Sequence, residues 1–104
     1  MSDIHKTWTD NRITVIGSTP RLLRFRASNW EHHLQARYSG LIENSRQRFV
    51  CEFKTISPPT EPLRGLSSRW PRLVLLLDYE IQHLRVKGLA KAEAGQLQDY
   101  TITY

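Results

Sequence analysis

The sequence predicts an α+β fold in which two helices cover one face of an antiparallel sheet. The run Phe49–Phe53 alternates apolar and polar residues, which is the period of a half-buried strand. The run Leu73–Leu77 is five consecutive aliphatic residues, too few to cross a membrane and typical of a strand buried on both faces. Between these runs, three prolines precede Leu63, Leu66 and Trp70 at helical spacing, which indicates a helix.

The other elements follow from local signals. Asn11–Ile16 is rich in β-branched residues and stops at Gly17, so we expect a strand there. Pro20 suits the first turn of the helix that follows. We expect strands at 11–16, 29–42, 47–53 and 73–79, helices at about 19–27 and 60–69, and a terminal hairpin of strands at 83–90 and 98–103 around Gly95.

Two points in the first half are ambiguous. Glu31–Tyr38 also fits a helix, but Leu34, Ala36 and Tyr38 alternate and the chain must return to the sheet, so we interpret 29–42 as a strand. Arg26 falls inside the apolar arc of the first helix. Either Arg26 extends its charged end to solvent, or the helix ends before Trp30.

The resulting order, βαββαβ with a terminal hairpin, predicts a ferredoxin-like two-layer sandwich. We expect a flexible segment at 1–10 and a single domain at 11–104. The residues expected to face the helices are Ile13, Val15, Phe49, Cys51 and Phe53. The residues expected on the opposite, open face are Arg12, Thr14, Ile16, Arg48, Val50, Glu52, Val74 and Leu76.

Composition narrows the class of partner without selecting one. The net charge is +5, which favours nucleic acid, an acidic protein surface or anionic lipid. The single cysteine, Cys51, excludes an internal disulfide and favours a reducing compartment. The first residues lack the apolar core of a signal peptide and no later run could span a bilayer, so we expect a cytoplasmic protein.

Two blocks of the chain resemble a known family. The first block is Asn11–Gly17 followed by Leu22–Arg26. The second combines Phe53-Lys54-Thr55, Ser57-Pro58-Pro59, Leu66-Ser67, Trp70-Pro71 and Tyr79-Glu80. Together they cover about two-thirds of the chain and resemble the YubB-type ferredoxin-like family of small proteins borne on plasmids and phages. The resemblance implies the fold and a mobile-element origin, and it implies no reaction or catalytic set. Family members usually carry an insertion before the third strand, where this chain has only the short bridge Leu41–Arg46.

No group of residues predicts a metal, cofactor or catalytic site. His32 and His33 are adjacent and would point to opposite faces of a strand, without the spacing of a metal motif. Cys51 lies at a core position, where a thiol fills space and has a raised pKa. Asp78 and Glu80 share a strand face, where we expect them to pair with arginines such as Arg48 or Arg85.

Two further features have structural explanations that are simpler than functional ones. Asp99 lies near a strand end, where surface pairing is a better explanation than acid–base chemistry. Gly17–Pro20 leads from a strand into a helix N-terminus, which can hold an anion, but it lacks the glycine-lysine signature of a phosphate loop. We therefore interpret Gly17–Pro20 as a turn.

Two surfaces remain as candidate binding sites. Arg21 and Arg24, with Lys6 and Arg12 expected nearby, could contact phosphates, as could Arg48. The open face lacks the stacking aromatics of RNA-reading domains on its central strands.

The apolar part of the open face is the other candidate. Val74 and Leu76 need a cover, and burying each contributes about 1.5–3 kcal/mol. Either the terminal hairpin curls over them, or another chain covers them, in which case we expect a protein contact with a second copy or a foreign partner. The sequence as a whole predicts a non-enzymatic binding protein of mobile-element origin, such as an anti-defence inhibitor of the anti-CRISPR kind. The alternative is a nucleic-acid-binding accessory module.

Overall fold

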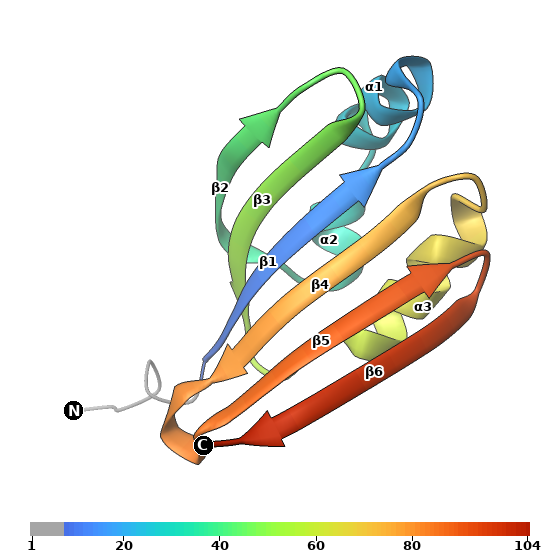
Figure 1. Ribbon diagram of the computed structural model, residues 1–104. Coiled ribbons are helices and arrows are strands. Elements are labelled where there is room, and N and C mark those ends of the chain that lie inside the picture. The colour runs from blue at the N-terminus through green and yellow to red at the C-terminus, as the bar shows by residue number, and fades with distance from the viewer. Residues whose placement is uncertain (1–7) are drawn as a thin grey trace.

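The computed structural model describes residues 8–104, which form one six-stranded antiparallel sheet and three α-helices. The strands are β1 (Thr9–Ile16), β2 (Arg37–Asn44), β3 (Arg48–Thr55), β4 (Val74–Ile81), β5 (Val86–Glu93) and β6 (Gln96–Thr103). The helices are α1 (Thr19–Ala27), α2 (Trp30–Leu34) and α3 (Thr60–Arg69), and a short 3₁₀ turn, η2 (Gln82–Leu84), joins β4 to β5. The strand order is β2-β3-β1-β4-β5-β6 (Figure 1).

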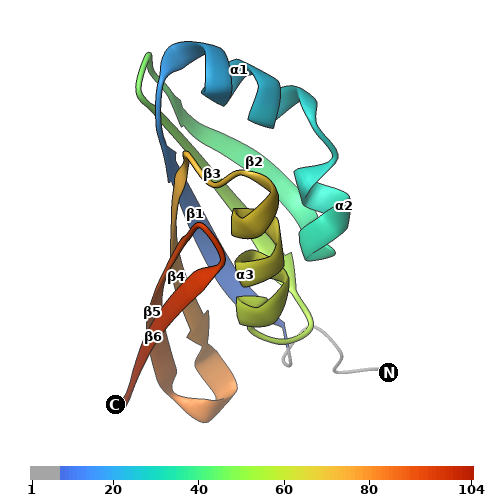
Figure 2. The same ribbon diagram turned by 90° about the vertical axis from the view of Figure 1, so that its right-hand side faces the viewer.

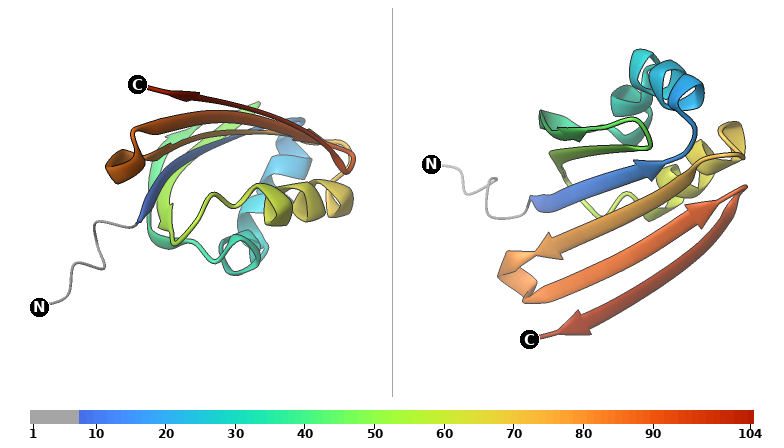
Figure 3. Two further views of the ribbon diagram at one scale, coloured as in Figure 1. Left: turned by 90° about the horizontal axis from the view of Figure 1, so that it is seen from below. Right: turned by 45° about the horizontal axis from the view of Figure 1, so that its top comes forward.

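All three helices lie on the same face of the sheet (Figures 2 and 3). The aromatic residues of that layer pack as a cluster in which Phe25 contacts Trp30, Phe49 and Trp70. Leu75 and Leu77 of β4 are fully buried beneath the helices. The opposite face has no helix over it among residues 8–104, and it is turned toward the viewer in Figure 1.

The predicted ferredoxin-like βαββαβ sandwich with a separate hairpin is wrong. The last two strands belong to the main sheet, because β5 pairs with all of β4 and β6 pairs with all of β5. This pairing satisfies the backbone N–H and C=O groups that the outer side of β4 would otherwise leave to solvent. A third helix, α2, also precedes β2. The hairpin therefore widens the open face instead of folding over it.

The interpretation of 29–42 as one strand is also wrong. Its first part forms α2, because Trp30 and Leu34 are one helical turn apart and both are buried in the core. Gln35 adopts the left-handed conformation, with φ of 56°, and ends the helix. The second part forms β2.

Most of the remaining elements agree with the sequence. The strand predicted at 83–90 instead runs from Val86 to Glu93, because Gln82–Leu84 forms the 3₁₀ turn η2. α1 and α3 have the predicted bounds, the strands at 11–16, 47–53 and 73–79 are each found within two residues, and Gly95 lies in the hairpin turn. Arg26 fits inside the apolar arc of α1 for both of the expected reasons. The helix ends before Trp30, and the Arg26 guanidinium extends over the Phe49 ring and donates a hydrogen bond to the side chain of Asn44. Of the expected flexible segment, residues 1–7 lie outside the described part, and 9 and 10 belong to β1.

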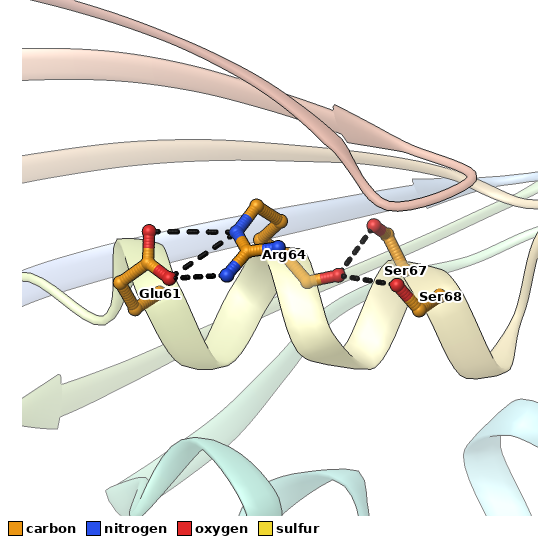
Figure 4. Close-up of polar contacts among 4 residues, drawn as sticks. All are labelled: Glu61, Arg64, Ser67 and Ser68. Atoms are coloured by element: carbon orange, nitrogen blue, oxygen red, sulfur yellow. Dashed lines mark hydrogen bonds and ion pairs between the residues drawn. The ribbon is translucent and has the colours of Figure 1, made fainter.

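The terminal hairpin is anchored to α3 by a serine. Ser67 is buried, and its hydroxyl donates a 2.7 Å hydrogen bond to the carbonyl of Arg64 within α3 (Figure 4). The same hydroxyl oxygen accepts a 2.9 Å hydrogen bond from the backbone N–H of Gly95 in the β5–β6 turn. Its neighbour Ser68 is exposed and makes only a long 3.4 Å contact with the same carbonyl. Ser67 therefore fixes the end of the hairpin against the helix layer.

Candidate binding surface

A shallow groove of about 870 Å³ crosses the open face and is lined by residues from all six strands. Its two flanks are apolar. Tyr38 and Ile42 of β2 lie on one flank, and Leu89, Tyr100 and Ile102 of β5 and β6 lie on the other. Each of these side chains is more than half exposed, from 51% for Ile42 and Leu89 to 69% for Tyr38. The open face is therefore an apolar surface as well as a charged one.

The register explains why the larger side chains of the hairpin face outward. Leu89 is paired with Asp78 and with Tyr100, so the three side chains share the open face. On the other side of β5, Ala90 and Ala92 are fully buried in the core beneath the helix layer. Small residues occupy the inward positions because α3 lies close over this strand.

The middle of the groove is lined by charged side chains whose charges nearly cancel. Four carboxylates (Asp10, Glu52, Asp78, Glu80) and three cations (Arg12, Lys54, Lys87) line it. Arg12 and Glu52 form an ion pair at 2.6 Å across β1 and β3, and Lys54 pairs with Asp10. Glu80 accepts a hydrogen bond from the Tyr104 hydroxyl, whereas Asp78 has no polar partner among residues 8–104. The net charge of +5 is therefore not concentrated in the groove.

Four of the arginines without an ion pair among the described residues lie instead at one end of the sheet. The β1–α1 link, the β2–β3 loop and the α3–β4 link meet at the upper right of the molecule (Figure 1). Thr19 donates a 2.7 Å hydrogen bond to the carbonyl of Arg46, which places the β2–β3 loop against the start of α1. Within the described residues, Arg21, Arg24, Arg46 and Arg72 form no ion pair with a carboxylate. We call these four residues the basic end.

The structure separates the arginines that the sequence grouped together. Arg21 and Arg24 belong to the basic end, whereas Arg12 and Arg48 lie on the open face beside acids. Glu43 accepts two hydrogen bonds from Arg48, at 3.0 and 2.6 Å, and this interaction lowers the pKa of Glu43 below its usual value. Local pairing compensates the charges of Arg12 and Arg48. Lys6, which we expected near Arg12, lies outside the described residues.

Val74 and Leu76 lie on the open face as predicted, but outside the groove. They face Ile16 and Thr14 of β1, and each is half-buried. Their neighbours on β5 are Glu93 and Lys91, whose side chains approach to 3.9 Å. β6 does not cover them, because it lies at the sheet edge beyond β5.

No family model, curated protein or solved structure matches this chain. The surface therefore has to be interpreted from its own chemistry. Among residues 8–104, no helix is both long and apolar enough to cross a membrane.

His32 and His33 lie on α2, and Cys51 lies on β3 with its side chain toward the helix layer. His32 is exposed on α2 and not on a strand, while His33 lies near α3, where its Nε2 would be 3.7 Å from a Cβ added to Gly65. No cluster of three or more metal-ligating side chains occurs among the described residues. Cys51 is buried on the core face as predicted, and burial raises the pKa of its thiol.

The expected ion pairs of Asp78 and Glu80 with Arg48 or Arg85 do not form. Arg48 binds Glu43, and the Arg85 guanidinium lies over the Tyr104 ring at 5.6 Å. Asp99 projects to the helix side of β6 and accepts a hydrogen bond from Tyr79. Gly17–Pro20 forms the strand-to-helix turn, with the Leu22 N–H bonded to the Ser18 carbonyl.

Sequence reasoning missed the apolar side chains of the groove flanks. The alternation of Tyr100 and Ile102 was visible, but alternation alone does not say which set faces the core. The signal that could have identified the inward set is the small-residue series Gly88, Ala90 and Ala92 on the paired strand. Small residues at every second position indicate a closely packed helix, and the large residues between them then face solvent.

Proposed function

We propose that this chain is a non-enzymatic binding protein that takes a protein partner onto the open face of its sheet. The observation that carries the proposal is the groove, which combines exposed apolar flanks with a nearly neutral charged centre. Protein interfaces are enriched in aromatic residues, which Tyr38 and Tyr100 supply on the flanks, and most of the charged side chains in the middle are already paired within the chain. A polyphosphate partner would instead select a surface of uniformly positive charge.

The resemblance to the YubB-type family supports an origin on a plasmid or phage. On that basis we propose a cytoplasmic protein that binds and modulates a macromolecule of the host or of the element itself. Inhibition of a host defence complex is one such role, and a small single domain with one wide binding face suits it. This proposal rests on the sequence resemblance together with the exposed groove.

One observation favours a second candidate function. The basic end gathers arginines without acidic partners among the described residues, and such a cluster suits phosphate binding. A nucleic-acid-binding accessory module would use this end and leave the groove free. The two functions therefore use separate surfaces.

Paired variants separate the two candidates. In the groove variant, Leu89→Lys and Ile102→Asp place charge on the apolar flank, each opposite a side chain of the other sign, Asp78 and Lys87 respectively. In the basic-end variant, Arg24→Gln and Arg46→Gln remove two exposed cations. All four positions are exposed, so we expect each change to alter stability by no more than about 0.5 kcal/mol.

The experiment is affinity capture with the full chain from a bacterial lysate, with and without nuclease, followed by binding of the captured protein to each purified variant. We expect capture that resists nuclease, survives the basic-end variant and weakens about tenfold or more in the groove variant. Capture that disappears with nuclease and with the basic-end variant would support the nucleic-acid module. Unchanged binding in the groove variant would exclude the open face as the docking surface.

A further inference from the structure

The two edges of the sheet differ in how well they are protected against pairing with another strand. β2, at one edge, has register shifts between Arg37 and Gly40 and between Leu41 and Glu43, and Tyr38 has a φ of 55°. Bulges and irregular backbone of this kind prevent a neighbouring strand from adding to an edge. β2 is therefore a protected edge.

β6, at the other edge, has none of these protections. It pairs with β5 without interruption from Gln96 to Thr103, and its residues all have non-positive φ. It contains no lysine, arginine or proline, its only charge is Asp99, and four of its eight residues are β-branched or aromatic. Among residues 8–104, no element lies beyond it (Figures 1 and 3). A regular edge of this composition is a template for pairing with a further strand.

The backbone groups that β6 offers can be assigned from the hairpin. Ala94 and Gly95 form a two-residue turn with φ of 50° and 82°, so Glu93 and Gln96 close the hairpin as a hydrogen-bonded pair. The Tyr104 N–H donates a 2.9 Å hydrogen bond to the Arg85 carbonyl, so residue 104, like residue 96, directs its backbone groups toward the neighbouring strand. The even-numbered residues of β6 therefore bond to β5, and the N–H and C=O groups of Leu97, Asp99, Thr101 and Thr103 point outward.

We propose that a second copy of this chain pairs with β6 in antiparallel orientation, which joins two sheets edge to edge about a two-fold axis at Tyr100. In this register Tyr100 faces Tyr100 of the other copy on the open face, and Gln98 faces Ile102. On the helix side Asp99 faces Thr101, whose hydroxyl is a donor that a carboxylate accepts. No like charges face each other, and all four outward positions of the strand are used.

The occupant is a second copy because the strand is complementary to itself in this register. The two copies present identical edges, which is the requirement of a two-fold interface. The protected edge at β2 stops further addition, so the assembly ends at a dimer and does not grow into a fibre. The proposal does not rest on the proposed function, although Tyr100 and Ile102 belong to both the groove flank and the dimer seam, and the two open faces would lie side by side in one continuous surface.

The test is the oligomeric state of the full chain, measured by sedimentation from micromolar to millimolar concentration. We expect a monomer–dimer equilibrium that high salt does not weaken, since no ion pair between the two copies holds the interface together. Thr101→Pro removes an outward N–H without removing a bond to β5, so we expect at least about a tenfold weaker dimer. The control is the circular dichroism spectrum of Thr101→Pro, which should match that of the wild type if the variant is folded.

Charged replacements of Tyr100, the residue at the two-fold axis, test the register of the two strands without changing the backbone as proline does. Tyr100→Lys and Tyr100→Glu each place like charges opposite each other, so each variant alone is expected to dimerise at least about tenfold more weakly. An equimolar mixture of the two should restore a heterodimer. The matched control is Gln98→Lys mixed with Gln98→Glu, because residue 98 faces Ile102 and no such rescue is expected.

Three results would overturn the proposal. The first is a wild-type chain that remains monomeric at millimolar concentration. The second is a dimer that Thr101→Pro and both Tyr100 variants leave unchanged. The third is a dimer lost in the single Tyr100 variants but not restored by mixing them, which would exclude a two-fold axis at Tyr100.

Discussion

The hydroxyl of Tyr79 on β4 donates a 2.9 Å hydrogen bond to the carboxylate of Asp99 on β6, across the whole width of β5. This hydrogen bond is possible because Gly88 is the residue of β5 opposite Tyr79, and the ring lies over it. One side chain thus ties the outer strand of the hairpin to the centre of the sheet. Because the hairpin carries one flank of the groove, its attachment to the sheet also fixes the shape of the candidate binding surface.

Tyr79→Phe should destabilise the protein by about 1 kcal/mol, because it removes one hydrogen bond and leaves an exposed carboxylate that water can solvate. The effect should depend on pH. Burial and the hydrogen bond to Asp99 raise the pKa of Tyr79 from 10.0 to about 12. The folded state therefore favours the neutral phenol, and this stabilisation is complete below pH 10.0 and is lost as pH rises toward about 12.

Urea denaturation at a series of alkaline pH values measures this effect as the difference in unfolding free energy between wild type and Tyr79→Phe. The comparison cancels the titration of the other tyrosines and lysines. We expect the difference to shrink between pH 10.0 and about 12. A difference that stays constant across that range would show that the phenol has the same pKa in the folded and unfolded states, which would contradict the raised pKa.

Gly88→Ala should destabilise the fold by about 1–3 kcal/mol, because the new Cβ would overlap the Tyr79 ring, which is buried. Gly40→Ala is the matched control, since a Cβ there meets nothing within 4 Å. Thermal denaturation of both variants checks the difference. In a double-mutant cycle, combining Gly88→Ala with Tyr79→Ala should remove most of the added cost, and additive effects would contradict the overlap.

Ser67→Ala should cost about 1–3 kcal/mol, because it leaves the Gly95 N–H without its partner in a partly buried turn. Ser68→Ala, one position along α3, removes only a long interaction at an exposed site and should be nearly neutral. Hydrogen exchange of the amides of β5 and β6 would show faster opening of the hairpin in Ser67→Ala alone. Equal exchange in the two variants would contradict an anchoring role for Ser67.

Any affinity for nucleic acid should depend on the basic end. Replacing Arg21 and Arg46 with glutamine should weaken it and reduce its dependence on salt by about one unit of slope for each phosphate that is no longer bound. Replacing Arg12 and Arg48 should have a smaller effect, because Glu52 and Glu43 already neutralise them. Titration of a short DNA duplex at several salt concentrations measures both. A larger effect of the Arg12 and Arg48 replacements would place the nucleic acid on the open face.

Part of the candidate surface was predictable and part was not. The period of two in β1 and β3 correctly assigned Ile13 and Phe49 to the core and Arg12 and Glu52 to the open face. The partners of the charged residues were not predictable, because pairing across strands depends on register and on which side chains lie near each other in space. Arg48, for example, lies within reach of Glu43 only because β2 bulges beside β3.

The sequence by itself determined the local elements, since the bounds of α1 and α3, the main strands and the hairpin turn follow from prolines, glycines and the spacing of apolar residues. Only the tertiary structure decided that β5 and β6 extend the main sheet, that residues 30–34 are helical, and that Leu89, Tyr100 and Ile102 face solvent. The physical reason is that periodicity reports that a strand has two different faces, whereas the choice of face and of neighbour depends on long-range packing, here of α3 over the alanines of β5.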